Sequence, residues 1–200
     1  MDVSAPIVAA IPGVAGHVVA ALLPTTKPLK GAEVAASCSA ASEMGVRKAL
    51  ARLVDSGVVL HVPGGYLLNR DHLVYPALEL LDGLHGALRR RIKASLVEWG
   101  REVAVAGIFG STARRDGNSE SDIDVLLISD DPALESFALD LSERVRQWTG
   151  NDCHVMALSI KEVRRMKRAG EPIVNAWVRE LEPIIGSIAE LLAPRRTTRS

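Results

Sequence analysis

The chain has 200 residues, of which 48% are hydrophobic, and its 24 basic residues balance its 24 acidic residues, so the formal net charge is zero. This composition is typical of a folded globular protein and excludes a disordered polyelectrolyte, and the length allows two small domains with separate cores. No run of residues suits a membrane span, and the two cysteines, Cys38 and Cys153, lack the spacing of metal ligands, so we expect a reduced, cytoplasmic protein.

The first apolar segment, residues 7–23, predicts an amphipathic helix. A signal peptide would begin with a basic stretch, whereas this chain carries Asp2 there, and Pro12 and Gly13 interrupt the apolar run. We therefore expect this segment to belong to the first domain.

Two helices and a hairpin are predicted next. Val46, Leu50, Leu53 and Val54 recur at helical spacing, and Gly57 is suited to follow the end of that helix. The predicted elements are a short helix over residues 31–37, a turn over 39–42, a longer helix over 43–56, and strands over 58–62 and 66–68, joined by a tight turn at 63–65.

This order of elements over residues 14–69 resembles the winged helix-turn-helix domain of small bacterial transcription regulators. The resemblance implies a DNA-binding domain over residues 1–72 whose longer helix enters the major groove. It implies contacts to DNA from Ser42, Glu43, Arg47, Lys48 and Arg52. Residues 25–72 carry six basic and four acidic residues, which is a small excess of positive charge for binding DNA. A homodimer would double this basic surface. The alternative is a winged helix that contacts protein.

Residues 73–100 predict a helix that connects two domains. Apolar side chains recur there at helical spacing, although Gly83 and Gly86 weaken the middle of the segment. The basic run over residues 89–93 is expected to face solvent.

A turn between two apolar strands is the most informative feature of the second half. Residues 103–109 predict one buried strand and residues 122–128 another, with Gly110 and Ser111 directly after the first. Because side chains alternate along a strand, Asp122 and Asp124 should point the same way and the residues between and after them into a core. Adjacent carboxylates repel each other unless a cation neutralises them, so the pair predicts a site for Mg²⁺ or Mn²⁺.

The turn itself predicts a phosphate site. Glycine lets the backbone approach a ligand closely, and free amide groups at the start of a helix near Thr112 attract phosphate. Ser111 can contribute a hydroxyl, and Arg114 a positive charge one helical turn further along. We therefore expect a nucleoside triphosphate to bind at Gly110, Ser111 and Arg114.

Gly110-Ser111, ten intervening residues and Asp122-Ile123-Asp124 resemble the signature of the nucleotidyltransferase superfamily that includes DNA polymerase beta, most closely its minimal branch. The resemblance covers residues 103–186. It implies a polymerase beta-like α/β domain with a mixed sheet over residues 101–193. It also implies that the domain uses Mg²⁺ to transfer a nucleoside monophosphate from a triphosphate to a hydroxyl group.

The resemblance further implies a third carboxylate on a neighbouring strand, here residues 152–158. His154 falls at the expected position of that acid, and Asp152 lies two residues earlier on the same predicted face. Both join Asp122 and Asp124 as candidate catalytic residues, although histidine is a poorer Mg²⁺ ligand than carboxylate. Arg115 is a second difference from the pattern of the resembled family, because many relatives carry glycine after the arginine.

The remaining segments predict helices around this site. Trp177 is expected in the core, and residues 194–200 are expected to form a disordered basic tail. Further helices are predicted from Asp131-Pro132 to before Gly150, from a capping box at Ser159–Glu162, and in two pieces punctuated by Pro172 and Pro183.

The sequence thus predicts a multidomain α+β protein in which a nucleotidyltransferase follows a DNA-binding winged helix-turn-helix. The acceptor is left open between a protein side chain, an RNA end and a small molecule. Since the third acid is not at its expected position, the alternative is a catalytically weakened regulator or antitoxin that senses nucleotide and binds DNA. A resistance enzyme that modifies a small molecule is a third interpretation.

Overall fold

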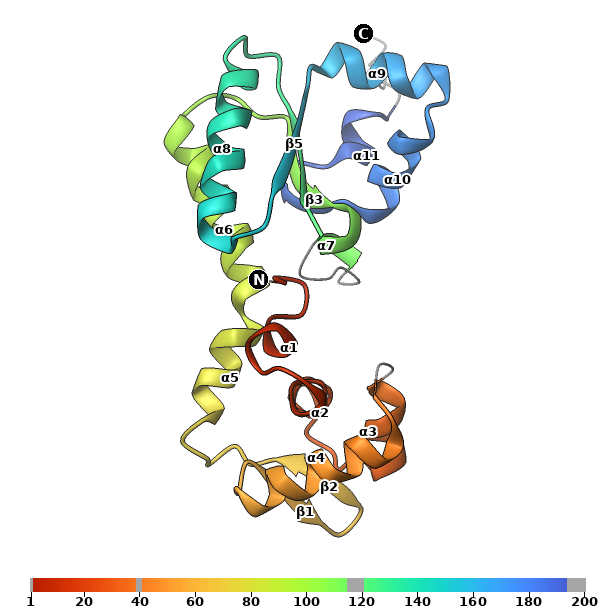
Figure 1. Ribbon diagram of the computed structural model, residues 1–200. Helices are drawn as coiled ribbons and strands as arrows, with labels where there is room; N and C mark the ends of the chain where they lie inside the picture. Colours follow the sequence, from red (N-terminus) through yellow and green to blue (C-terminus); the bar gives the residue numbers. More distant parts are fainter. Residues whose placement is uncertain (1, 39–40, 115–120, 194–200) are drawn as a thin grey trace, which may run out of the picture. The chain divides into compact units, whose positions relative to one another are not determined.

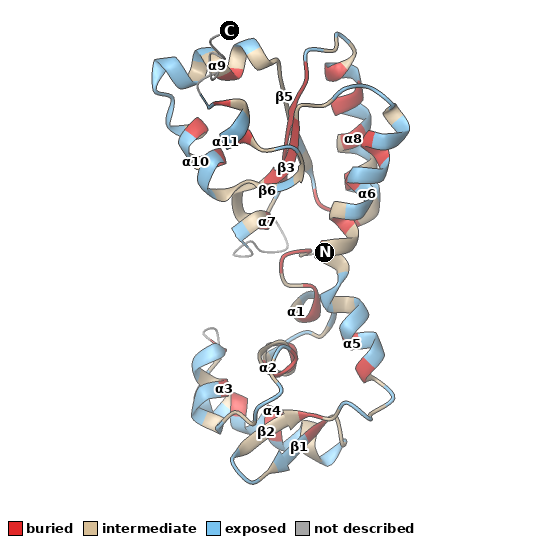
Figure 2. Cartoon of the chain, turned by 180° about the vertical axis from the view of Figure 1, so that it is seen from behind, coloured by how far each residue is buried: buried red, intermediate tan, exposed pale blue. Residues whose placement is uncertain are grey.

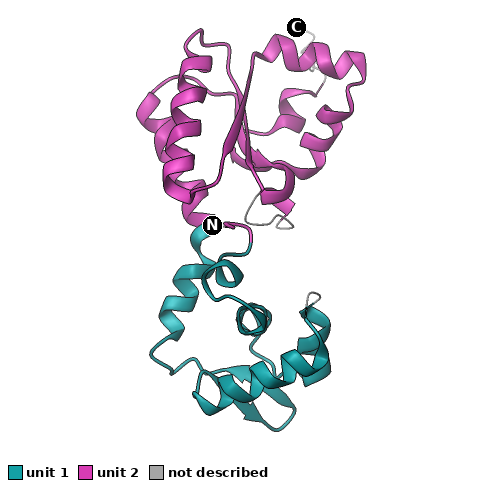
Figure 3. Ribbon diagram, viewed as in Figure 1, with its two compact units in different colours: residues 1, 5–85 teal, residues 2–4, 86–200 magenta. Residues whose placement is uncertain are grey.

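The computed structural model describes residues 2–38, 41–114 and 121–193 (Figure 1). The chain forms two compact units (Figure 3). The amino-terminal unit holds residues 5–85, and the carboxyl-terminal unit holds residues 2–4 and the chain from Gly86 onward. Arg115 and the tail over residues 194–200 lie outside the described residues. Within the described residues, no helix is long and apolar enough to cross a membrane.

The amino-terminal unit consists of helices around one antiparallel hairpin. Its elements are α1 (Pro6–Ala10), α2 (Val14–Leu22), α3 (Gly31–Ser37), α4 (Glu43–Asp55), β1 (Val59–Val62), β2 (Gly65–Leu68) and α5 (Tyr75–Asp82). The hairpin pairs Val59 with Leu68 at its open end, and an isolated bridge joins Leu29 to Tyr66. Helices α2, α3 and α4 meet in a core that includes the fully buried side chains of Val18, Leu22 and Val34.

The single amphipathic helix predicted over residues 7–23 was wrong. The segment forms two helices, α1 and α2, separated at Ile11–Gly13. Pro12 lacks a backbone N–H, and Gly13 adopts a positive φ of 79°, so neither continues a helix. The turn between them folds so tightly onto α2 that a Cβ added at Gly16 would collide with the carbonyl oxygen of Ile11.

The carboxyl-terminal unit is built on a mixed four-stranded sheet in the order β5-β4-β3-β6. Strand β3 is antiparallel to both neighbours, and β4 and β5 are parallel. The elements are α6 (Leu84–Trp99), β3 (Val105–Phe109), α7 (Gly110–Arg114), β4 (Ile123–Ile128), α8 (Leu134–Thr149), β5 (Cys153–Leu158), α9 (Ile160–Ala169), α10 (Pro172–Glu180), β6 (Glu182–Ile185) and α11 (Ile188–Leu191).

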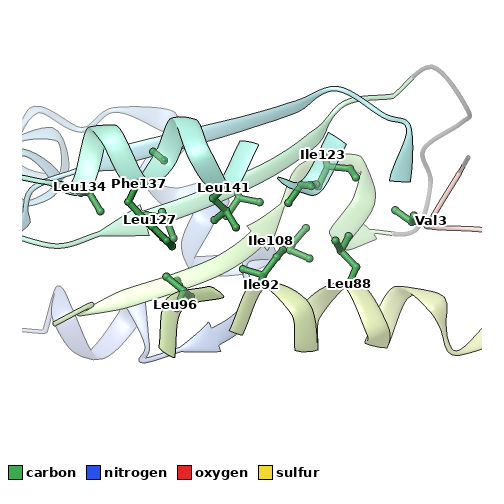
Figure 4. Packing of buried hydrophobic residues seen from close by; sticks show 14 residues of the cluster. Val3, Leu88, Ile92, Leu96, Ile108, Ile123, Leu127, Leu134, Phe137 and Leu141 are labelled. Atoms are coloured by element: carbon green, nitrogen blue, oxygen red, sulfur yellow. The ribbon is translucent and has the colours of Figure 1, made fainter. Parts of the chain in front are cut away.

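Helices cover both faces of this sheet, so its central strands are buried (Figure 2). On one face, side chains of α6 and α8 pack with Ile108 of β3 and with Ile123 and Leu127 of β4 (Figure 4). On the other face, Leu126 and Ile128 pack with side chains of α9, α10 and α11, including the fully buried Trp177. The strand that begins with the acidic pair is therefore anchored on two sides.

The predicted strands around the acidic pair and the capping box of α9 are present. Ser159 Oγ accepts from the Glu162 N–H, and the Glu162 carboxylate accepts from the Ser159 N–H at 2.8 Å. Pro183 lies between the helices α10 and α11, but within a strand that was not predicted, β6, an edge strand that tolerates the missing N–H. The segment predicted as one connecting helix forms α5 and α6, which are separated at Gly83.

Candidate active site

The turn after β3 places the backbone of Gly110 directly against Asp124. Phe109 at the end of β3 pairs with Asp124 on β4, and Gly110 follows with a φ of 71°. A Cβ added at Gly110 would lie 2.5 Å from Asp124 Oδ2. Only glycine combines this backbone conformation with such a close approach to the carboxylate.

The two aspartates lie at the start of β4. Asp122 is exposed just before the strand, and Asp124 is its second residue, with 30% of the side chain exposed. Partial burial is the main cause that raises the pKa of Asp124 above its ordinary value, while His154 acts in the opposite direction. The negative charge of Asp122 also raises this pKa, and the positive charge of Arg114 lowers it. The two carboxylates are thus close enough to repel each other.

The structure brings His154, and not Asp152, beside this pair. His154 pairs with Asp124 in the β4–β5 ladder, and its Nδ1 lies 4.0 Å from Asp124 Oδ1. Asp152 precedes β5, and its exposed carboxylate lies near Arg146 of α8, whose pKa is raised chiefly by Glu143 and to a smaller extent by Asp152. The register of the two strands places His154, and not Asp152, opposite Asp124.

Cys153 lies between these two residues and is suited to packing and not to metal binding. Burial, together with the charges of Asp124 and Asp122, raises the pKa of its thiol to about 12. The thiol therefore keeps its proton near neutral pH, and only a thiolate binds metal well. Its side chain packs against the core between the sheet and α8.

Arg114 reaches the site from α7 but also makes an ion pair that the sequence did not reveal. Its guanidinium lies 2.9 Å from Glu180 Oε2 at the end of α10. The side chain of Arg114 is 46% exposed. Glu180 is 66 residues away in the sequence and belongs to no recognisable motif, so only the fold could bring it here.

A sequence profile for the nucleotidyltransferase domain matches residues 89–197, which is more than half of the chain. The chain belongs to this nucleotidyltransferase domain family. A search of curated proteins gave no match.

Three solved structures resemble part of this nucleotidyltransferase. A toxin–antitoxin complex with AMP-PNP is 15% identical with a TM-score of 0.40, over 52% of this chain and 80% of that chain. The tri-AMPylated Shewanella oneidensis HEPN toxin in complex with MNT antitoxin is 13% identical with a TM-score of 0.37, over 53% and 76%. A mutant of the toxin–antitoxin MntA-HpeT is 14% identical with a TM-score of 0.39, over 52% and 80%.

The donor set of the nucleotidyltransferase site suits a cation that is shared with a substrate. Among residues 2–38, 41–114 and 121–193, no group of three or more histidine, cysteine, aspartate or glutamate side chains is arranged to hold a metal ion. Asp122 and Asp124 offer two carboxylates that repel each other. Mg²⁺ commonly binds through one or two carboxylates and completes its shell with phosphates and water, which fits this pair.

In the amino-terminal unit, the predicted DNA-contacting residues lie on or next to α4. Ser42 caps this helix, because its Oγ accepts from the Gly45 N–H at 3.2 Å. Glu43, Arg47, Lys48 and Arg52 are exposed, and opposite them Val46 and Leu50 are buried in the core. In the part of the chain that the structure describes, none of these four charged side chains forms a salt bridge.

Proposed function

We propose that the carboxyl-terminal unit is a metal-dependent enzyme that transfers a nucleoside monophosphate from a nucleoside triphosphate to a hydroxyl group. The observation that carries this proposal is the close approach of the Gly110 backbone to the carboxylate of Asp124. It joins a backbone suited to phosphate and a carboxylate suited to a cation at one end of the sheet.

Each residue has a distinct role in this proposal. Asp122 and Asp124 hold the cation, which when bound neutralises charge on the phosphates and polarises the attacked phosphorus. Gly110 leaves room for the phosphates, Ser111 donates its hydroxyl, and Arg114 adds a positive charge. Glu180 limits where the Arg114 guanidinium can go, since the two side chains are paired.

The transfer itself forms a bond between the acceptor oxygen and the α-phosphorus and breaks the bond from that phosphorus to the bridging oxygen of pyrophosphate. The hydroxyl proton leaves to water or to His154, whose Nδ1 lies 4.0 Å from Asp124 Oδ1. A protein side chain, an RNA end and a small molecule are all chemically suitable acceptors.

A label-transfer assay tests this proposal. The protein is incubated with each α-labelled nucleoside triphosphate, Mg²⁺ or Mn²⁺, and cell extract, and label that becomes attached to an acceptor is measured. We expect transfer with at least one triphosphate and none after removal of the metal by chelation. Transfer that persists undiminished in Asp122→Ala would reject the metal assignment.

We propose that the amino-terminal unit is a winged helix-turn-helix that binds DNA. The order of α2, α3, α4 and the hairpin, the Leu29–Tyr66 bridge beside the hairpin, and the exposed cations of α4 support it. Binding to the protein's own promoter should weaken with added salt and in Arg47→Ala, because phosphate contacts dominate affinity. A matched control is Arg179→Ala on α10, which also removes one exposed arginine. Equal loss in both variants would argue against a DNA-reading helix.

A second candidate is a DNA-binding regulator or antitoxin that binds nucleotide without turnover. The observation that favours it is His154 at the position where a third carboxylate is expected beside Asp124. The two candidates differ in one measurement: nucleotide binding with no transfer under any metal or acceptor condition supports the regulator. Transfer supports the enzyme.

A further inference from the structure

Strand β5 is an edge of the carboxyl-terminal sheet and pairs only with β4. The N–H of Ile123 donates to the carbonyl of Asp152 at 2.9 Å, and the N–H of Ser129 donates to the carbonyl of Leu158 at 3.1 Å. In a parallel ladder the backbone groups of alternate residues face the neighbouring strand, so the even-numbered residues of β5 face β4. The backbone N–H and C=O of Val155 and Ala157 therefore point away from the sheet.

The open part of this edge is two residues long. Before it, the carbonyl of Cys153 accepts from Ser142 Oγ at 2.6 Å, and after it, the N–H of Ser159 donates to Glu162 at 2.8 Å. Within the described ranges, no hydrogen bond satisfies the outward groups of Val155 and Ala157. Two donors and two acceptors are thus open, symmetrically about Met156.

A groove runs beside this edge, with one face of α8 as its other wall. Its volume is about 520 Å³. The lining residues of α8 are Glu135, Ala138, Leu139 and Ser142, whose spacing of three and four residues places them on one helical stripe. Leu139 is 75% exposed in this stripe, and Ala138 and Ser142 are small enough to let another helix approach closely. The surface therefore combines an open strand with an unpartnered helix face.

The two edges of the sheet differ in how they are protected. At the opposite edge, β6 carries Pro183 and Glu182, and its pairing with β3 is irregular between Ala106 and Gly107. Proline, charge and irregular pairing are common devices against strand association. Strand β5 has the sequence Cys-His-Val-Met-Ala-Leu, with no proline, lysine or acidic residue, and its pairing is regular. An unprotected edge beside an apolar helix stripe is a surface suited to association.

We propose that two copies of this chain associate through β5, antiparallel and related by a two-fold axis at Met156. Val155 then lies opposite Ala157 of the partner subunit, and each such pair exchanges two hydrogen bonds. The four bonds use the outward N–H and C=O groups of Val155 and Ala157 on both edges. The same axis brings the two α8 stripes together on one face of a continuous eight-stranded sheet.

A second copy fits this surface better than an isolated peptide does. The occupant has to present a strand with a helix beside it, and a second copy presents that same pair in the matching arrangement, as an isologous interface requires. Four backbone hydrogen bonds and one helix contact make a small interface, so we expect a concentration-dependent dimer with a dissociation constant of about micromolar size. This inference does not depend on the proposed enzymatic activity.

Sedimentation velocity of the full chain over a range of concentrations tests the association. Leu139→Lys places a charge in the α8 stripe and should raise the dissociation constant of the dimer at least about tenfold. Val97→Lys is the matched control, because Val97 on α6 is 69% exposed in the same unit but outside the groove. A chain that stays monomeric at all concentrations, or a dimer that Leu139→Lys and Val97→Lys affect equally, would overturn the proposal.

A cross-linking experiment tests the position of the axis. Met156→Cys, in a chain that also carries Cys153→Ser, places two thiols opposite each other in a non-hydrogen-bonded pair, where a disulfide is geometrically favourable. Leu158→Cys in the same background is the control, since the two thiols would then lie several residues apart. We expect rapid disulfide-linked dimers from the first variant only. No cross-link at position 156, or equal cross-linking at both positions, would contradict the axis. Circular dichroism confirms that each variant is folded.

Discussion

Strand β4 carries a pair of acidic residues at each end, and the two pairs have opposite surroundings. Beyond its carboxyl end, Asp130 Oδ1 accepts from the Ile160 N–H at 2.9 Å, and Asp131 Oδ1 accepts from the Ala133 N–H at 2.8 Å. Asp131 also forms an ion pair with Arg101, with 3.4 Å between the charged atoms. Asp130 thus binds an N–H of the first turn of α9, and Asp131 closes a turn just before α8, so hydrogen bonding accounts for both carboxylates.

The pair at the other end of β4 has no comparable partners. In the described ranges, no hydrogen bond reaches the side chain of Asp122 or Asp124, and His154, whose Nδ1 lies 4.0 Å from Asp124 Oδ1, is positively charged only when protonated. A carboxylate that is partly buried beside another carboxylate destabilises a fold unless a ligand is present. The contacts around an acidic residue therefore distinguish a structural aspartate, whose carboxylate is hydrogen-bonded, from one that is free to bind a ligand.

The largest effect is expected for Asp124→Asn, which should lose transfer of the nucleoside monophosphate. The amide keeps the shape of the side chain but removes a charge that binds the cation, so we expect the rate to fall at least about a thousandfold. Single-turnover transfer of labelled nucleoside monophosphate measures it. A residual rate within about tenfold of the original would contradict the assigned role of this carboxylate.

The same substitution should not destabilise the metal-free protein. Because the pKa of Asp124 is raised in the folded state, the stability that this group contributes is present at low pH and is lost as pH rises through the raised pKa. Asparagine does not titrate, so Asp124→Asn should gain stability relative to the original protein between acidic and neutral pH in a chelating buffer. Urea unfolding at several pH values measures this. If Asp124→Asn instead became less stable than the original protein as the pH approached neutral, the carboxylate would have a structural role.

The next largest effect is expected for Gly110→Ala, which should lower transfer by about ten- to a hundredfold. The added methyl group collides with Asp124 Oδ2, and alanine at a φ of 71° is strained by about 1–2 kcal/mol. Gly170→Ala is the matched control, because Gly170 has a φ of 72° but nothing within 4 Å of an added Cβ. Both variants should lose similar stability in thermal unfolding. Equal losses of transfer would indicate strain alone and not displacement of Asp124.

A smaller effect distinguishes the two candidates for the third position. His154→Asn should lower transfer by about tenfold, since the imidazole beside Asp124 is lost, and Asp152→Asn should leave the rate unchanged. The measurement is the rate of label transfer at saturating metal and triphosphate. The reverse order of effects would place Asp152, and not His154, in the site.

The sequence predicted the local parts of this site and not the long-range ones. The strand, turn and strand around Gly110 follow from short apolar runs and from a glycine between them, which act within a few residues. Asp152 and His154 share a predicted face, so the choice between them depended on the register of β5 against β4, which pairs His154 with Asp124.

Two further features have no local signal at all. Strand β6 is four residues long and contains Pro183, so neither alternation nor composition marks it as a strand. The pair of Arg114 with Glu180 joins residues 66 positions apart, and it exists only because α10 packs near α7. Such contacts require the three-dimensional arrangement, whereas the pattern around the acidic pair does not.

The smallest effect is expected on stability, for a substitution of Asp131 beyond the carboxyl end of β4. Asp131→Ala removes the acceptor for the Ala133 N–H just before α8 and should lower the free energy of unfolding by about 1 kcal/mol, the usual net contribution of one hydrogen bond. Transfer should be unchanged, because this residue lies at the opposite end of β4 from Asp124. Arg101→Ala is the control, because it removes the ion pair with Asp131 but leaves the hydrogen bond from the Ala133 N–H. At this half-exposed site it should lower the free energy of unfolding by less than Asp131→Ala does. If Asp131→Ala lowered transfer without lowering the free energy of unfolding, the two acidic pairs would not differ in the way described, because a hydrogen-bonded carboxylate would then not identify a structural aspartate.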